Sequence, residues 1–164
     1  NPCEHKVQYY ETDGMGIVHH SNYIRWFEEA RVDLLEQLGF GYDRIEPQAR
    51  GPVLEVSCQY KTMSKFGETV SIQAAITQYN GVRMTLHYNV FDKATGELRC
   101  TGDSRHCFIN SDGHPAILRR CWPEFDAALA SHVTAENKDK QKNRLRQRCF
   151  PSAEPVFSIS VYLT

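Results

Sequence analysis

Residues 10–23, YETDGMGIVHHSNY, combine an acid, two glycines and a pair of histidines directly before a predicted helix. A carboxylate such as Asp13 can act as a nucleophile, or as a general base towards water. The first N–H groups of a helix lack partners within the helix and lie at the positive end of its dipole, which suits a developing oxyanion. Gly14 and Gly16 let a substrate approach the backbone, and His20 adds an imidazole. This equipment suits acyl transfer, although Asp-Gly before a helix is also a common turn.

The elements around this loop are a strand before it and a helix after it. Residues 4–12 (EHKVQYYET) are rich in Val and Tyr and predict a first strand. From Ser21 or Asn22, either of which is a good N-cap, an apolar stripe at helical spacing runs to Leu38 and stops at Gly39. The stripe consists of Tyr23, Ile24, Phe27, Ala30, Leu34, Leu35 and Leu38. It predicts the longest helix of the chain.

The rest of the domain alternates with a period of two and predicts four antiparallel strands. The alternating segments are 53–60, 69–79, 82–90 and about 97–109. Asn80-Gly81 predicts a type I′ hairpin between the second and third of them, and Pro123 begins a short helix to about His132. A single long helix on one face of such a sheet buries both apolar faces at once. The sequence therefore predicts an α+β domain in which an antiparallel five-stranded sheet wraps one central helix.

The composition is that of an ordinary globular domain. The 164 residues are 41% hydrophobic and 24% charged, with a formal net charge of −1. A chain with so little net charge has no overall basic field, so neither nucleic acid nor an anionic membrane is an expected partner. No apolar run approaches the ~20 residues of a membrane span, and no secretory signal opens the chain, so we expect a cytoplasmic protein.

Six cysteines are spread irregularly through the chain without a CxxC pair. In the absence of a secretory signal we expect them to be reduced thiols, mostly in the core. A zinc site built from Cys100, Cys107 and His106 matches no known ligand spacing. We therefore expect neither a metal nor another cofactor.

The last part of the chain differs from the rest. We expect one domain over residues 1–132 and a tail over residues 133–164. Between residues 134 and 149 the tail carries six basic and two acidic side chains, which gives 6 − 2 = +4. This segment is either solvated and disordered or an arm that contacts phosphate groups, and the final PVFSISVYLT is strand-like.

The loop also carries a pattern, Y-x-x-x-D-x-x-G-x-V-x-H-x-x-Y, that resembles a known family. The pattern is formed by Tyr9, Asp13, Gly16, Val18, His20 and Tyr23, and Phe27-Glu28 and Arg31 follow it. These residues are similar to those of acyl-CoA thioesterases of the 4-hydroxybenzoyl-CoA thioesterase type, which have the hotdog fold. The order of elements is also similar, and the resemblance covers about residues 4–132. It implies hydrolysis of acyl-CoA to the free acid and CoA.

The resemblance implies a role for each matching residue of the loop. Asp13 is expected to attack the thioester carbonyl or to activate water. His20 is expected to assist hydrolysis, while the backbone N–H at that position polarises the thioester oxygen. Tyr9 matches an active-site tyrosine of some members.

The remaining matches concern substrate binding. Gly16 and Val18 keep the geometry of the loop, and Tyr23 is expected in the core or in the lining of the acyl pocket. Lys65, which is not part of the family pattern and lies in the turn before the strand at 69–79, is either a contact for the CoA phosphates or a solvated surface residue. The resemblance also implies a homodimer or homotetramer, with acyl-CoA at the interface between subunits.

Two other functions fit the same fold. Hotdog enoyl-CoA hydratases resemble an Asp-x-Asn-Pro-x-His pattern, whereas here His19 and His20 stand six and seven residues after Asp13 and no Asn-Pro is present. A non-catalytic module that binds acyl thioesters is the second alternative. The acyl group, and the choice between CoA and an acyl carrier protein, stay open.

Overall fold

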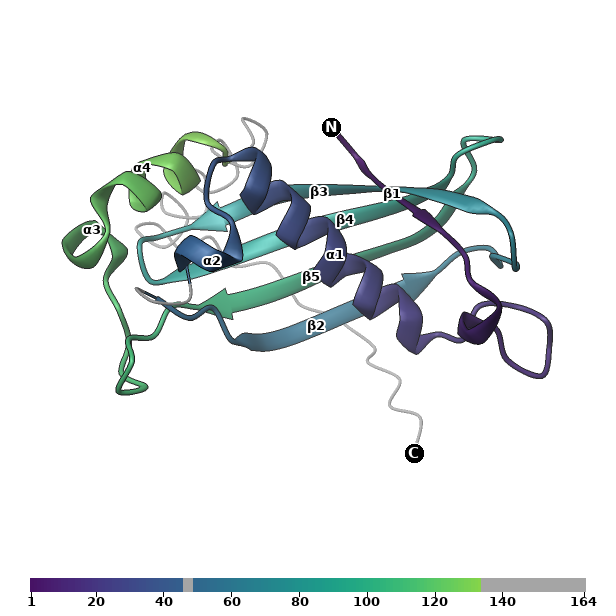
Figure 1. Cartoon of the computed structure of the whole chain (residues 1–164), viewed down its shortest axis with the longest axis horizontal. Helices are drawn as coiled ribbons and strands as arrows, with labels where there is room; N and C mark the ends of the chain where they lie inside the picture. Colours follow the sequence, from purple (N-terminus) through teal and green to yellow (C-terminus); the bar gives the residue numbers. More distant parts are fainter. Residues whose placement is uncertain (46–48, 134–164) are drawn as a thin grey trace, which may run out of the picture. The chain divides into compact units, whose positions relative to one another are not determined.

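One long helix and five antiparallel strands form the domain (Figure 1). The computed structural model describes residues 1–45 and 49–133. In chain order the elements are β1 (Cys3–Lys6), the 3-10 helix η1 (Tyr9–Glu11), α1 (Ser21–Gln37), α2 (Tyr42–Ile45), β2 (Val53–Tyr60), β3 (Thr69–Tyr79), β4 (Arg83–Asp92), β5 (Leu98–Cys107), α3 (Leu118–Cys121) and α4 (Pro123–Ser131). The strands lie in the order β1-β3-β4-β5-β2. This arrangement confirms the predicted α+β architecture.

The helix α1 lies across one face of the sheet (Figure 1). It packs there through large aromatic side chains. Trp26 and Phe27 are buried, and the Phe27 ring stacks on Tyr88 of β4 with 4.4 Å between ring centroids. Gly102 of β5 leaves room for this ring, because a Cβ there would lie 2.4 Å from Phe27 Cε2 and 2.5 Å from Ser57 O. The glycine therefore allows α1 to approach the sheet closely.

The period-two pattern located the four later strands correctly, but it did not give the turn type. β2 and β3 have the predicted bounds, and β4 and β5 differ from the prediction by one or two residues at each end. A type I′ turn needs a positive φ at both central residues. Gly81 has a φ of +89°, whereas no described non-glycine residue has a positive φ. The type I′ prediction is wrong: Asn80 Oδ1 instead accepts hydrogen bonds from the N–H groups of Val82 and Arg83.

The first strand is shorter than predicted. β1 ends at Lys6, and Tyr9–Glu11 form the 3-10 helix η1 instead of continuing the strand. The cause is the Glu11 side chain, which turns back and accepts a hydrogen bond from Gln8 N–H at 2.7 Å. Such a local bond favours a turn over the extended backbone that β-branched and aromatic residues otherwise prefer.

The start of α1 also differs from the prediction. His20 is the N-cap, with a helical φ of −51°, and no side chain caps the helix there. Neither candidate cap plays that part: Ser21 Oγ lies 2.8 Å from His19 Nδ1, and Asn22 Nδ2 donates to Glu11 O at 2.8 Å. The helix at 123–132 was predicted, whereas the four-residue helices α2 and α3 were not.

The strand β2 forms one edge of the sheet and pairs only with β5 among the described strands. Its apolar side chains lie in solvent to an unusual extent, with Leu54 52% and Tyr60 48% exposed. An exposed apolar edge is a ready surface for pairing with another chain.

No helix of the described residues is long and apolar enough to cross a membrane. The basic segment and the strand-like end of the expected tail, residues 134–164, lie outside the described residues.

Candidate active site

The loop between η1 and α1 is closed by its own backbone hydrogen bonds. Thr12 and Val18 pair as an antiparallel bridge, and Asp13 N–H donates to Ile17 O at 2.9 Å. Gly16 N–H donates to Asp13 O at 2.9 Å. Gly16 has a φ of +73°, which explains why a glycine is needed at this position.

The Asp13 carboxylate is partly buried and fixed at one of its two oxygens. Its Oδ1 accepts a hydrogen bond from Met15 N–H at 2.8 Å. This bond orients the carboxylate within the loop, so that the group does not rotate freely. Within the part of the chain that the structure describes, no hydrogen bond joins Asp13 to His20.

His20 lies at the first turn of α1 with its ring exposed. The ring lies 4.1 Å from that of His19 and meets the edge of Tyr60 at 6.5 Å, both between ring centroids. The Tyr60 hydroxyl of β2 donates to His20 O at 3.0 Å. Tyr60 therefore ties the start of α1 to the exposed edge strand, a link that the sequence did not reveal.

Tyr9 lies in η1 and is 78% exposed. Its ring meets Phe66 edge-on at 5.7 Å between centroids, and Phe66 is itself exposed. The structure thus places two aromatic side chains in solvent beside the loop, with Lys65 exposed next to Phe66 in the chain.

Val18 and Tyr23 belong to the core next to the loop. Val18 is buried, and its N–H donates to Ser64 O at 2.9 Å. The Tyr23 hydroxyl donates to Ser64 Oγ at 3.1 Å, and burial raises the pKa of Tyr23. Ser64 therefore holds both residues, while Lys65 follows it on the surface.

Glu11 is a buried acid that the sequence analysis did not single out. Its carboxylate accepts hydrogen bonds from Trp26 Nε1–H at 2.8 Å and from Gln8 N–H at 2.7 Å, and it lies 2.9 Å from His5 Nε2. Its backbone oxygen accepts His19 N–H at 2.8 Å. Burial by itself raises the pKa of Glu11, but these three side-chain and backbone hydrogen bonds outweigh it and lower the pKa. Glu11 thus joins β1, the loop and α1.

A second buried polar group follows the inward face of β5. Tyr88 Oη lies 2.8 Å from Ser104 Oγ, which lies 2.8 Å from His106 Nε2. On the other side of the ring, Arg31 Nη1 lies 3.2 Å from His106 Nδ1. Because a guanidinium only donates, Nδ1 accepts, and the neutral ring carries its hydrogen on Nε2. Gly51 O, 3.3 Å from Nδ1, is the acceptor that a protonated ring would use instead.

Burial and the adjacent Arg31 charge lower the pKa of His106 to about 4. The imidazole is therefore neutral at pH 7. In the sequence, the signal for this group is the spacing of two between Ser104 and His106, which puts both side chains on the same face of β5. Arg31 is the polar residue of α1 that faces them.

The cysteines within residues 1–45 and 49–133 are free thiols. Cys58 of β2 and Cys100 of β5 approach with 3.1 Å between their sulfur atoms. This contact lowers the pKa of Cys58 and raises that of Cys100. No group of three or more His, Cys, Asp or Glu side chains in the described part of the chain is placed to hold a metal ion.

Comparison with known proteins yields consistent matches. The model of a family described as the thioesterase-like superfamily matches residues 7–143. The putative acyl-CoA thioesterase YneP of Bacillus subtilis is 35% identical over 127 residues, which covers 76% of this chain and 91% of that protein.

Solved structures match over a similar length. The DHNA-CoA thioesterase of Staphylococcus aureus is 33% identical, covers 85% of this chain and 93% of its own, and has a TM-score of 0.77. A gentisyl-coenzyme A thioesterase is 25% identical, covers 77% of this chain and 98% of its own, and has a TM-score of 0.68. The residues matched by the family model include the loop, α1 and the strands β2 to β5.

Proposed function

The chain belongs to the thioesterase-like superfamily and has the hotdog fold, and from this membership we propose that it hydrolyses acyl-CoA thioesters at the loop that carries Asp13. The observation that carries the proposal is the Asp13 carboxylate itself, held at one oxygen by Met15 N–H directly before the start of α1. Because the loop is closed by its own hydrogen bonds, the carboxylate is pre-organised for reaction.

Two routes use the same carboxylate. In the first, an Asp13 oxygen attacks the thioester carbonyl, CoA leaves as its thiolate, and water then hydrolyses the mixed anhydride. In the second, Asp13 takes a proton from water, whose oxygen attacks the carbonyl before the thiolate leaves. Both routes consume one water and yield the free acid and CoA.

The developing oxyanion needs a hydrogen-bond donor near the start of α1. His20 N–H is our candidate, because no acceptor is hydrogen-bonded to it among the described residues. The bond from Tyr60 to His20 O supports this role by fixing the backbone of His20. The imidazole of His20 and the Tyr9 ring would then contact substrate from the exposed side, with Lys65 nearer the CoA phosphates.

We also propose that the active form is at least a homodimer that pairs through β2. The support is the exposed apolar edge strand and the link from Tyr60 to the start of α1. Pairing of two β2 strands would cover this edge and bring the substrate to the interface between subunits. A homotetramer would be a pair of such dimers.

The test is release of CoA thiol from a panel of acyl-CoA substrates, from acetyl to palmitoyl, with benzoyl, phenylacetyl, DHNA and gentisyl added because of the relatives. Asp13→Asn keeps the shape of the side chain and removes the charge, so kcat should fall more than about tenfold, a barrier increase of over ~1.4 kcal/mol. Asp112→Asn, at an exposed turn, is the matched control and should retain activity.

Two results would overturn the proposal. If Asp13→Asn kept more than a tenth of the wild-type kcat, Asp13 would not be the catalytic carboxylate. If enoyl-CoA were hydrated, or acyl-CoA bound, without thiol release from any substrate, the chain would instead be a hydratase or a binding module.

A further inference from the structure

Two thiols on neighbouring strands lie in contact with each other at the sheet face that packs on α1. The sulfur atoms of Cys58 in β2 and Cys100 in β5 are 3.1 Å apart. Cys100 is wholly buried in the hydrophobic core. Cys58 packs against the same core but keeps part of its surface in solvent, so a small reagent can reach it.

The register of the two strands brings these thiols together. Cys58 lies opposite Gly102, and Cys100 lies opposite Tyr60, so the cysteines are diagonal neighbours on one face of the sheet. Gly102 presents no side chain beside Cys58, and the thiol therefore meets the next side chain on that face, which is Cys100. The contact depends on the pairing of β2 with β5, because the two cysteines are 42 residues apart in the chain.

The two thiols differ as a reactive cysteine and a resolving cysteine do. The hydrogen bond with Cys100 lowers the pKa of Cys58 to about 7, although partial burial opposes this shift. About half of the Cys58 side chains are therefore thiolate at neutral pH, and the thiolate is the form that attacks a peroxide. The same contact, together with burial, raises the pKa of Cys100, which stays a thiol.

We propose that Cys58 and Cys100 form a reversible disulfide when the protein meets a hydroperoxide, and that this bond lowers the activity of the Asp13 loop. The Cys58 thiolate attacks the O–O bond of hydrogen peroxide, which gives the sulfenic acid of Cys58 and a hydroxide that takes up a proton to become water. The Cys100 sulfur then attacks the Cys58 sulfur, and the sulfenic hydroxyl leaves with the Cys100 proton as a second water. Two thiols thus lose two electrons in total, and one peroxide is reduced to two waters.

Formation of the bond must move the edge strand. The sulfur atoms have to approach by about 1 Å, to the ~2.05 Å of a disulfide. Diagonal neighbours in a sheet have Cα atoms roughly 7–8 Å apart, whereas a disulfide spans ~4.4–6.8 Å, so rotation of the side chains is not sufficient. Among the described strands β5 is held on both sides, by β4 and β2, whereas β2 pairs with β5 alone. The strand that shifts is therefore β2.

A shift of β2 is transmitted to the start of α1. Tyr60 follows Cys58 by two residues on this strand, and its hydroxyl donates to His20 O at 3.0 Å. A displacement of about 1 Å takes this contact beyond the distance of a hydrogen bond. The backbone of His20, our candidate for the oxyanion donor, then loses the bond that fixes it.

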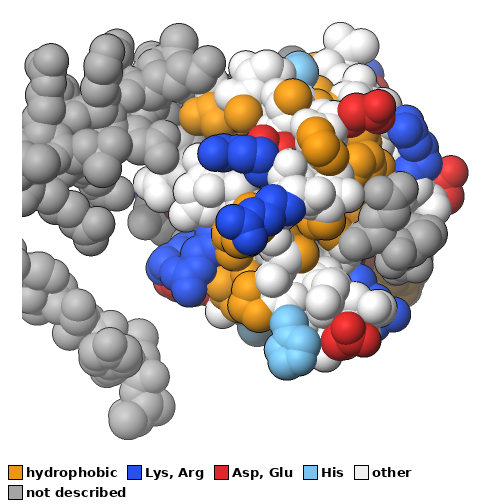
Figure 2. All heavy atoms as spheres, turned by 90° about the vertical axis from the view of Figure 1, so that its left-hand side faces the viewer, with side chains coloured by type: hydrophobic (Ala, Val, Ile, Leu, Met, Phe, Trp, Pro, Cys, Tyr) orange, Lys and Arg blue, Asp and Glu red, His pale blue; other side chains and the backbone are white. Residues whose placement is uncertain are grey.

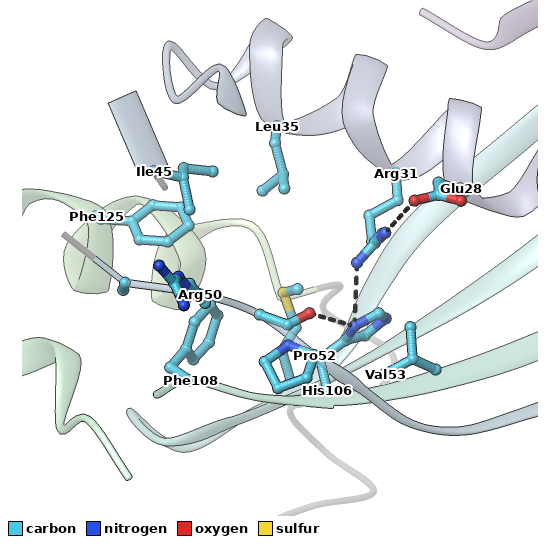
Figure 3. A pocket seen from close by; sticks show the side chains of 13 residues that line it. Glu28, Arg31, Leu35, Ile45, Arg50, Pro52, Val53, His106, Phe108 and Phe125 are labelled. Atoms are coloured by element: carbon cyan, nitrogen blue, oxygen red, sulfur yellow. Dashed lines mark hydrogen bonds and ion pairs between the residues drawn. The ribbon is translucent and has the colours of Figure 1, made fainter. Parts of the chain in front are cut away.

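The route through Tyr60 is distinct from an effect on the pocket. Neither cysteine is among the described residues that line the cavity in Figure 3, whose wall includes His106 and Phe125. Side chains project from the face of a sheet and not from its backbone edge, so pairing of β2 with a second copy does not consume the Cys58 thiol. The effect on catalysis rests on the proposed function, whereas the formation of the disulfide does not.

The disulfide is tested by treating the full chain with hydrogen peroxide, blocking the remaining thiols with iodoacetamide and mapping the peptides by mass spectrometry. The expected product is a cross-link between Cys58 and Cys100 that dithiothreitol reverses. Its absence, or a bridge from Cys58 to a different cysteine, would overturn the proposal.

The matched variants are Cys58→Ser, which should form no such cross-link, and Cys121→Ser, which should form it as the wild type does. Cys121 is an exposed cysteine of α3. This helix lies at the other end of the domain from the Cys58–Cys100 pair, the end that faces the viewer in Figure 2.

The effect on activity is measured as release of CoA thiol before oxidation, after it and after reduction, with excess reagent removed. Loss of an oxyanion donor costs ~10²–10³-fold in kcat, so displacement of one should lower kcat at least about tenfold, and reduction should restore it. Cys58→Ser should match the reduced wild type and keep its activity after peroxide, which separates the disulfide from oxidation elsewhere in the chain.

Tyr60→Phe removes the bond to His20 O, so its kcat should be low already and should fall little further on oxidation. Full activity of the cross-linked wild type would refute the link from the disulfide to the site. If no form of the chain released thiol, the proposed function would fail instead, and the peptide map would still decide whether the disulfide forms.

Discussion

The neutral imidazole of His106 makes the stability of the domain depend on pH in a window that is set by burial. His106 has a pKa of about 4 in the folded chain, against about 6.5 in an unfolded one. Between these values the unfolded chain binds the proton and the folded chain does not. Stability therefore rises with pH across this window and falls as the solution is acidified from pH 6.5 towards pH 4.

The size of the effect follows from the two pKa values. At pH 5 the ring is about 97% protonated in the unfolded chain and about 9% protonated in the folded chain. The free energy of unfolding is therefore about 2 kcal/mol lower at pH 5 than at pH 7. Well below pH 4 the free energy of unfolding is lower by about 3 kcal/mol, because the two pKa values differ by about 2.5 and each pH unit between them corresponds to ~1.36 kcal/mol. Asp92 has a pKa of about 2, lowered mainly by its hydrogen bond with Arg99. The stabilisation from this carboxylate is complete above about pH 4 and is lost only at more acidic pH.

The perturbation is His106→Gln, which keeps a polar side chain and removes the titration. The assay is urea unfolding at pH 7 and pH 5 at one protein concentration, since any oligomer makes stability concentration-dependent. The variant should be less stable at pH 7 because of lost packing, but its loss between pH 7 and pH 5 should be about 2 kcal/mol smaller than that of the wild type. His114→Gln, at an exposed histidine, controls for the removal of any imidazole. Equal losses in the wild type and His106→Gln would refute the claim that burial beside Arg31 keeps the ring neutral.

Three further outcomes are expected. His20→Ala should lower kcat less than Asp13→Asn if the backbone N–H carries the oxyanion; equal collapse of both, with normal circular dichroism, would make the imidazole a full partner. Leu54→Lys should convert a dimer into a folded monomer in sedimentation velocity, while Ile117→Lys at another exposed apolar position should not; a monomeric wild type with full activity would contradict the interfacial site. Gly102→Ala should cost about 1–3 kcal/mol in urea unfolding because its Cβ would meet Phe27 and Ser57, whereas Gly14→Ala, with open space around it, should cost less; equal costs would show that α1 shifts to make room.

The sequence predicts those elements in which apolar residues recur with a clear period. β2, β3 and α1 were located to within a residue at most positions, because each has one apolar face. The 3-10 helix at Tyr9–Glu11 escaped prediction, because its conformation depends on the buried Glu11 carboxylate, which accepts a hydrogen bond from Gln8 N–H. No local pattern shows that a Glu turns inwards.

In the candidate site too, residues that are close in the sequence could be predicted and contacts between distant residues could not. The loop residues from Asp13 to His20 are contiguous, so spacing alone identified them as a unit. The Arg31–His106 contact joins residues 75 positions apart, and it depends on how α1 lies over β5. Residue types on two separate elements do not reveal that one will place a cation against a neutral ring on the other.

Glu11 has a consequence for how the Asp13 loop opens. Glu11 accepts hydrogen bonds from Gln8, His19, Asn22 and Trp26. It also lies 2.9 Å from His5 Nε2 of β1, so the strand before the loop and the helix after it are both held by this one residue. Local unfolding that frees the loop must break this anchor and expose Trp26 as well. The loop should therefore open in the same cooperative unit as the first turns of α1. Its amides should exchange more slowly than those of other surface loops. The carboxylate of Asp13 thus gains its rigidity from Glu11, two residues earlier in the chain.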